Sequence, residues 1–114
     1  MRNLEQIRAE NALEPAKSLS RSAVNKLPAM ILANGLLATA AFCEAEGGGE
    51  NRKDMKKAMD ATAKHLAKRG LIASNISNTQ GLIEDLSGRS SAELQRAASE
   101  ALAFISYLKR FAPK

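Results

Sequence analysis

The chain has 114 residues, of which 45% are hydrophobic and only 4% aromatic, and its net charge is +5. This length predicts a single domain spanning residues 1–114, and the hydrophobic fraction is too high for a disordered chain. The lone cysteine excludes an internal disulfide, and chains without disulfides are usual in a reducing cytosol. The opening MRNLEQIRAE lacks the apolar core of a signal peptide. We therefore expect a cytoplasmic protein.

Composition also predicts the fold class. Alanine, leucine, lysine, glutamate and arginine are abundant, whereas aromatic residues, which favour strands, are scarce. No run of four to eight residues alternates cleanly between apolar and polar positions. We expect an all-α protein, a compact bundle of about five helices.

The first predicted helix starts after Asn3, because Gln6 three positions later completes a capping-box pattern. Pro15 ends or kinks this helix. The polar segment 17–26 that follows is predicted to be a connection that holds at most a short helical turn.

The second predicted helix covers residues 28–46 and is the most apolar part of the chain. Pro28 suits the first helical turn, and the glycines at 47–49 stop the helix. Because no face of this segment is polar, we expect a central helix that is buried on all sides. Asn34 and Gly35 interrupt it, and we expect the glycine to admit a close helix contact and the amide to be hydrogen-bonded by a neighbour.

Two other interpretations of this segment fail. A membrane span needs about 20 apolar residues, and this stretch is short and contains Asn34, Gly35 and Thr39, so we expect no membrane association. A phosphate-binding loop needs Lys-Ser or Lys-Thr after its glycines, whereas Glu50 and Asn51 follow here.

Positive charge is concentrated in the third predicted helix, residues 51–70. This segment holds seven Lys or Arg and two Asp, an excess equal to the net charge of the whole chain. Helical spacing gives it an apolar face and an opposite basic face. The apolar face comprises Met55, Met59, Thr62 and Leu66, and the basic face comprises Lys53, Lys56, Lys57, Lys64 and Lys68. The basic face is either a solvated surface that aids solubility or an anion-binding surface.

A short helix is predicted around residues 82–86, and the last helix runs over 91–112 behind a Ser90–Glu93 capping box. Tyr107 falls outside the apolar stripe of this last helix, on the side of Arg96. It either stacks on a base or a partner subunit, or packs against another helix with its hydroxyl at the surface.

No catalytic constellation is evident in the sequence. His65, the only histidine, lies at the border between the two faces of its helix, and we expect it to be an incidental surface residue. Cys43 is expected to be a small core residue. One Cys and one His exclude a zinc pattern, so we expect no metal. Because no catalytic constellation is evident either, we expect no cofactor and no enzymatic activity.

Two segments resemble a known family. One is the Pro-x-x-Ile-x-x-Asn-Gly-Leu run at residues 28–36, and the other is the Leu-Lys-Arg-Phe-Ala ending at residues 108–112. Together, in this order and at this spacing, they resemble the small α-helical subunit of the type III-B CRISPR RNA-silencing complex, the fifth of the Cmr proteins. Tyr107 departs from the pattern, since a Trp is expected before Leu-Lys-Arg.

The resemblance implies a non-catalytic role in antiviral defence. Copies of such a subunit stack beside the filament that holds the guide RNA and contact the sugar-phosphate backbone of guide and target, while another subunit cuts RNA. The implied partners are other Cmr subunits, further copies of this chain, guide RNA and target RNA. Because guide and target sequences vary, phosphate contacts by Lys and Arg suit this role. The candidates are Lys26, Lys109 and Arg110, within or beside the two segments, and, from the charge pattern alone, Lys57, Lys64 and Lys68.

Two alternatives remain open. The first is that the chain is a free-standing DNA-binding module that places residues 51–70 in a groove, although only Asn51 and Arg52 at the start of that segment suit base edges. Otherwise it is a structural adaptor without nucleic-acid contact, whose basic face serves solubility.

Overall fold

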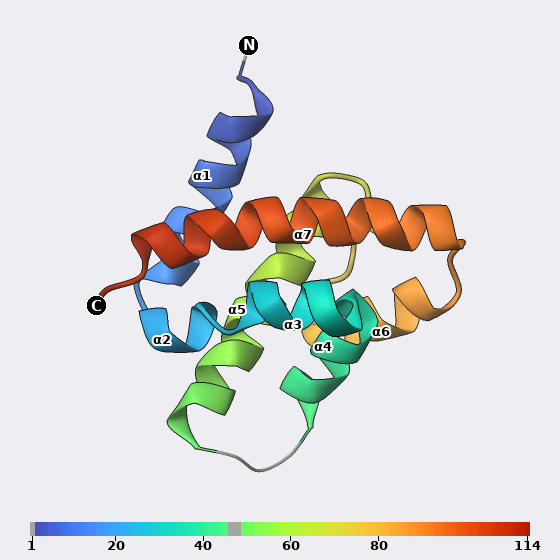
Figure 1. The fold of residues 1–114 in the computed structure, drawn as a ribbon. Coiled ribbons are helices and arrows are strands. Elements are labelled where there is room, and N and C mark those ends of the chain that lie inside the picture. Colours follow the sequence, from blue (N-terminus) through green and yellow to red (C-terminus); the bar gives the residue numbers. More distant parts are fainter. Residues whose placement is uncertain (1, 46–48) are drawn as a thin grey trace.

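A computed structural model describes residues 2–45 and 49–114 and contains, within these ranges, seven helices and no strand. The predicted all-α bundle is thereby confirmed. In Figure 1 the long last helix (red) crosses the width of the molecule, with the first helix (blue) rising above it and most of the other helices below it. The helices are α1 (Leu4–Ala16), α2 (Arg21–Val24), α3 (Leu27–Asn34), α4 (Leu36–Glu44), α5 (Glu50–Lys68), α6 (Thr79–Ser87) and α7 (Ser91–Phe111).

The first and last helices begin at the predicted capping boxes. Asn3 Oδ1 accepts a hydrogen bond from the backbone N–H of Gln6 at 2.9 Å, and Gln6 Oε1 accepts one from the N–H of Asn3 at 2.8 Å. Ser90 and Glu93 form the equivalent box before α7. Pro15 lies inside the last turn of α1 and does not end the helix before it. α1 packs most extensively against α7.

The single helix predicted over residues 28–46 is wrong, because the chain breaks at Gly35 into α3 and α4. Gly35 has φ +91° and ψ 163°, a backbone conformation that is essentially restricted to glycine. The backbone N–H of Gly35 still donates to the carbonyl of Ile31 at 2.8 Å, and the Thr39 hydroxyl donates to the Gly35 carbonyl at 2.8 Å. The predicted end at residue 46 lies outside the described residues.

The predicted close helix packing at Asn34 and Gly35 is also wrong. A Cβ atom built on Gly35 would meet no atom within 4 Å. The Asn34 side chain is exposed, so water satisfies its amide and no buried partner is required. Glycine is needed here for its backbone conformation and not for space.

α3 and α4 are not buried on all sides. Leu27 and Ile31 of α3, and Leu36 of α4, point into the core, but Leu32 is 75% exposed and Phe42 is 41% exposed. Between Lys26 and Glu44 the sequence contains no charged residue. The outer surface of this helix pair is therefore both exposed and uncharged.

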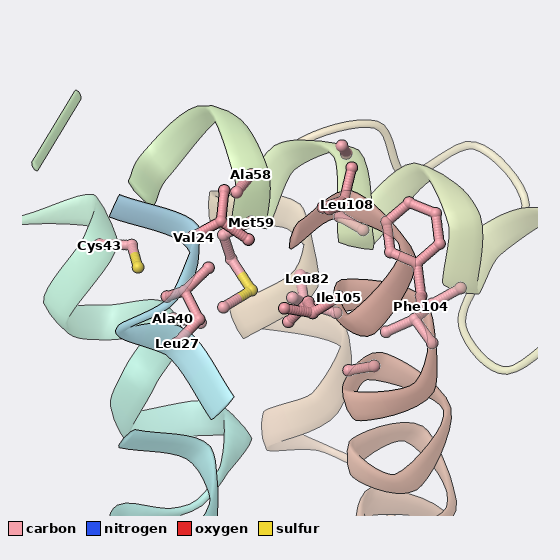
Figure 2. Packing of buried hydrophobic residues seen from close by; sticks show 14 of the residues in the cluster. Val24, Leu27, Ala40, Cys43, Ala58, Met59, Leu82, Phe104, Ile105 and Leu108 are labelled. Carbon is pink, nitrogen blue, oxygen red and sulfur yellow. The ribbon is translucent and has the colours of Figure 1, made fainter. Parts of the chain in front are cut away.

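The core forms where α2, α3, α4, α5, α6 and α7 meet (Figure 2). Leu27, Met59, Leu82 and Phe104 are fully buried there, each from a different helix. The apolar face predicted for α5 is confirmed, since Met55, Met59, Thr62 and Leu66 are all buried, and the five lysines of its basic face are exposed. Within the described ranges, no helix is long and apolar enough to cross a membrane.

The prediction that His65 lies at the surface is wrong, because the imidazole is buried in a polar network that joins α1, α5 and α7. Arg8 donates two hydrogen bonds to the Glu100 carboxylate, at 2.8 and 2.7 Å. His65 Nε2 lies 2.8 Å from Glu100 Oε2, and the Asn11 amide lies 2.9 Å from His65 Nδ1. The imidazole also stacks on the Phe104 ring, with centroids 4.3 Å apart.

Protonation in this network follows from burial and hydrogen bonding. Burial lowers the pKa of His65, and this outweighs the opposing effect of the hydrogen bond to Glu100. Burial alone would raise the pKa of Glu100, but hydrogen bonds from Arg8 and His65 hold it below its ordinary value. A neutral His65 that donates from Nε2 and accepts at Nδ1 from Asn11 satisfies both ring nitrogens.

Candidate nucleic-acid interface

The two aspartates of α5 are bound to the starts of other helices. Asp54 Oδ2 accepts a hydrogen bond from the backbone N–H of Ser20 at 2.7 Å, just before α2. Asp60 Oδ1 accepts from the N–H and the hydroxyl of Thr79, at 2.7 and 2.6 Å, at the start of α6. These carboxylates serve a structural role, so the solvent-facing charge of residues 51–68 comes from its lysines.

All six cations predicted to contact RNA are exposed, but they lie in three separate places. Lys26 precedes α3, and Lys109 and Arg110 lie in the last turn of α7. The other three, Lys57, Lys64 and Lys68, lie on α5. The structure therefore does not gather the six predicted residues into one patch.

The lysines of α5 border a groove between α1 and α5. Two adjoining hollows of about 450 and 220 Å³ make up this groove. Lys57, Lys64 and Lys68 line one side, and Glu10 and Glu14 of α1 line the other. Because carboxylates face these lysines, the positive potential in the groove is partly cancelled.

Arg21 holds the end of α7. Its guanidinium donates to the carbonyl oxygen of Arg110 at 3.1 Å and to that of Ala112 at 2.9 Å. These carbonyls have no partner within the helix, so Arg21 supplies the cap that the last turn lacks. The contact uses only the backbone of Arg110, whose side chain remains exposed.

Lys26 borders a second, smaller site, which we call the Phe42 hollow. Its volume is about 250 Å³. The Arg52 guanidinium carbon lies 3.8 Å from the centroid of the Phe42 ring, a cation–π contact. The lining residues are Lys26, Met30, Phe42, Gly49, Asn51, Arg52 and Met55.

Tyr107 is half-buried and packs against the core. Its ring centroid lies 6.1 Å from that of Phe111. Burial and the neighbouring Glu5 carboxylate of α1 raise the pKa of Tyr107. Of the two predicted alternatives, this placement favours packing against another helix. Arg96 is exposed on α7, about three turns nearer the start of the helix.

Cys43 is a core residue, as predicted. Its thiol is buried, and burial raises its pKa to about 11, so it is protonated at neutral pH. Among the described residues, no group of three or more His, Cys, Asp or Glu side chains is placed to hold a metal ion.

Sequence reasoning misses the structural contacts of Arg21 and Phe42, and it considers Arg52 only as a residue suited to base edges and not as the partner of Phe42. Phe42 falls in a helix that is predicted to have no exposed face, so its partnership with Arg52 is invisible in the sequence. Glu100 carries a signal that could have been used. It lies beside Ala97 and Ala101 on the buried stripe of α7, and a carboxylate in that position requires a partner.

The described residues form a small helical bundle that carries exposed cations and, over α3 and most of α4, an uncharged surface. The model of the family described as CRISPR-associated protein (Cas_Cmr5) matches residues 2–114. The chain belongs to this Cmr5 family, which confirms the resemblance seen in the sequence. It is a subunit of a CRISPR Cmr complex, and membership implies association with other Cmr subunits. No curated protein and no solved structure matches the chain.

Proposed function

We propose that this chain is a non-catalytic structural subunit of the type III-B complex, that its copies stack beside the guide-RNA filament, and that its exposed cations contact the RNA backbone. Membership of the Cmr5 family supports the assembly role. The observation that carries the RNA role is that all six candidate cations are exposed to solvent. Asp54 and Asp60 of α5, by contrast, are bound to backbone N–H groups.

The three cationic places differ in how well they suit a phosphate. Glu10 and Glu14, which are ion-paired with Arg2 and Lys17, lie across the groove from the α5 lysines and lower the positive potential that those lysines offer to a phosphate. Lys109 and Arg110 line neither this groove nor the Phe42 hollow and are exposed at the end of α7. We therefore assign the main backbone contacts to Lys26, Lys109 and Arg110, and a lesser share to α5.

This role does not require base-edge recognition. Of the two residues of α5 suited to reading bases, Arg52 lies with its guanidinium over the Phe42 ring, which suits stacking rather than insertion into a groove, and Asn51 Oδ1 accepts a long hydrogen bond from the Ser22 hydroxyl at 3.5 Å. This argues against the alternative of a free-standing DNA-binding module that inserts α5 into a groove.

The test is RNA binding by the isolated subunit and by the reconstituted complex across a salt series. We expect the isolated subunit to bind RNA weakly and without sequence preference. Its log K should fall linearly with log salt, with a slope of about −0.7 for each phosphate contact on a single strand. Tight binding to one DNA or RNA sequence that does not change with salt would instead support the DNA-binding alternative. An adaptor without nucleic-acid contact predicts no binding by the isolated subunit and no effect of the cation variants in the complex.

A further inference from the structure

The Phe42 hollow differs in charge from the other hollows described on the surface. The groove between α1 and α5 includes Glu10, Glu14 and Asp60, and a shallow hollow beside α6 includes Glu84 and Asp85. By contrast, the described lining of the Phe42 hollow has two cations, Lys26 and Arg52, and no carboxylate. The two cations suit a ligand that carries negative charge at its edge.

The remaining lining of the hollow is apolar and planar. Met30 and Met55 contribute thioether side chains, and Phe42 is 41% exposed although it is a large aromatic residue. An exposed phenylalanine under a guanidinium is an arrangement on which a flat, polarizable ring stacks. The volume of about 250 Å³ falls just below the roughly 300 Å³ at which pockets for larger organic ligands begin. It suits one ring system and not a whole oligonucleotide.

We propose that the Phe42 hollow binds one unpaired base of RNA, stacked on the Phe42–Arg52 pair, while Lys26 contacts the phosphate next to that base. This inference rests on the proposed RNA role and extends it from backbone contact to base stacking. Aromatic rings and guanidinium planes stack on every base, so the contact tolerates any sequence. That tolerance is what a subunit needs when guide and target change with each invader.

The chain contains no Trp, so Phe42→Trp would introduce a single fluorescent reporter into the hollow. The full-length variant would be titrated with a hexauridylate and with an abasic ribose-phosphate oligomer of equal length and charge. We expect the hexauridylate to quench the Trp fluorescence and the abasic oligomer not to quench it. We also expect the unmodified protein to bind the hexauridylate about tenfold more tightly than the abasic oligomer.

The ratio of these two affinities separates stacking from charge. Phe42→Ala should bring the ratio close to one, and Phe42→Tyr should preserve it. Arg52→Gln should weaken binding of both oligomers, because it removes a charge as well as a stacking plane. Phe111→Ala is the matched control, since Phe111 is similarly exposed at 38% but lies outside the hollow, and it should leave the ratio unchanged.

A second measurement uses the assembled complex with the unmodified chain. RNA that carries 4-thiouridine would be photo-crosslinked, and adducts should map to Phe42 or Met30. If the complex binds RNA with the expected salt dependence but shows no adduct here, and Phe42→Ala keeps the affinity ratio, the base site is refuted while the backbone role stands. If the complex retains RNA equally well with and without the subunit's cations, the proposed function itself fails.

Discussion

Glu100 is the residue on which the buried network of α1, α5 and α7 depends. We expect Glu100→Ala to destabilise the protein by about 3–5 kcal/mol, because removing one partner leaves the Arg8 guanidinium and the His65 ring without their acceptor. Urea unfolding followed by circular dichroism measures this. Glu84→Ala is the control, since Glu84 is exposed and its loss should stay within about 0.5 kcal/mol. Equal effects of the two substitutions would contradict the role given to Glu100.

The network also predicts how stability depends on pH. The pKa of His65 is lower in the folded protein than its ordinary value of 6.5, so the unfolded chain binds a proton that the folded chain does not. The free energy of unfolding should therefore be highest above pH 6.5 and should fall below it, by at most about 1.4 kcal/mol per pH unit, until the folded-state pKa is reached. Below about pH 4.5 the lowered pKa of Glu100 adds a second loss.

Because His65 is the only histidine in the sequence, the loss of stability just below pH 6.5 can be assigned to it by mutation. In His65→Gln the decline just below pH 6.5 should disappear, whatever the substitution does to stability at pH 7.5. Urea midpoints at several pH values would show this. A variant profile that still declines between pH 6.5 and 5.5 would mean that other groups cause the pH dependence.

At the level of secondary structure, two explanations for Gly35 can be told apart by mutation: the chain needs a glycine there either for its backbone conformation or to leave space for a neighbouring helix. Its conformation at φ +91° is strained for any L-residue, whereas a Cβ there would meet nothing. Gly35→Ala and Gly35→Leu should therefore cost similar amounts, each on the order of 1–3 kcal/mol. Thermal or urea unfolding of the two variants decides the matter. A far larger cost for leucine than for alanine would restore the close helix contact predicted from the sequence.

The helices that could be predicted carry their own start signals. α1 and α7 begin at side-chain caps that sit a fixed distance from a Gln or Glu, and α5 shows its two faces through the spacing of Met and Lys. The junction of α3 and α4 has no such signal. No side chain caps α4, and a lone glycine inside an apolar helix costs only about 1 kcal/mol, so the sequence does not distinguish a tolerated glycine from a break.

For the whole molecule, the cations at the end of α7 give the sharpest test of RNA contact. We expect Lys109→Ala with Arg110→Ala to leave the fold intact, because Arg21 binds the backbone carbonyl of Arg110 and not its side chain. Retention of target RNA by the assembled complex should weaken. At duplex charge density, the slope of log K against log salt should become shallower by about 0.9 for each phosphate that the variant no longer neutralises.

The control for this pair is Lys57→Ala with Lys64→Ala, which should have a smaller effect because Glu14 faces both lysines and Glu10 also faces Lys64. RNA affinity across a salt series, with incorporation checked by native mass, measures both variants. If the end-of-helix variant incorporates normally and its curve overlays that of the parent, these residues do not bind RNA. If it fails to incorporate, they belong to an interface between subunits.

The candidate site was predictable in its residue types but not in its arrangement. The family resemblance identified Lys26, and the charge pattern identified the α5 lysines, as candidate cations, and all of them are exposed. It did not show that α1 carboxylates face one set, or that Lys26 shares a hollow with Arg52 and an aromatic ring. These relations join segments distant in sequence, so they emerge only from tertiary packing.

The uncharged outer surface of α3 and α4 has a practical consequence for mapping how this subunit is assembled. No Lys or Arg lies between Lys26 and Arg52, so lysine-reactive cross-linkers have no attachment point there and trypsin has no cleavage site. A blank in such data over these helices says nothing about whether a neighbour covers Leu32 or Phe42. Carbene or hydroxyl-radical labelling, which modifies exposed aliphatic and aromatic side chains, would report directly on this surface before and after assembly.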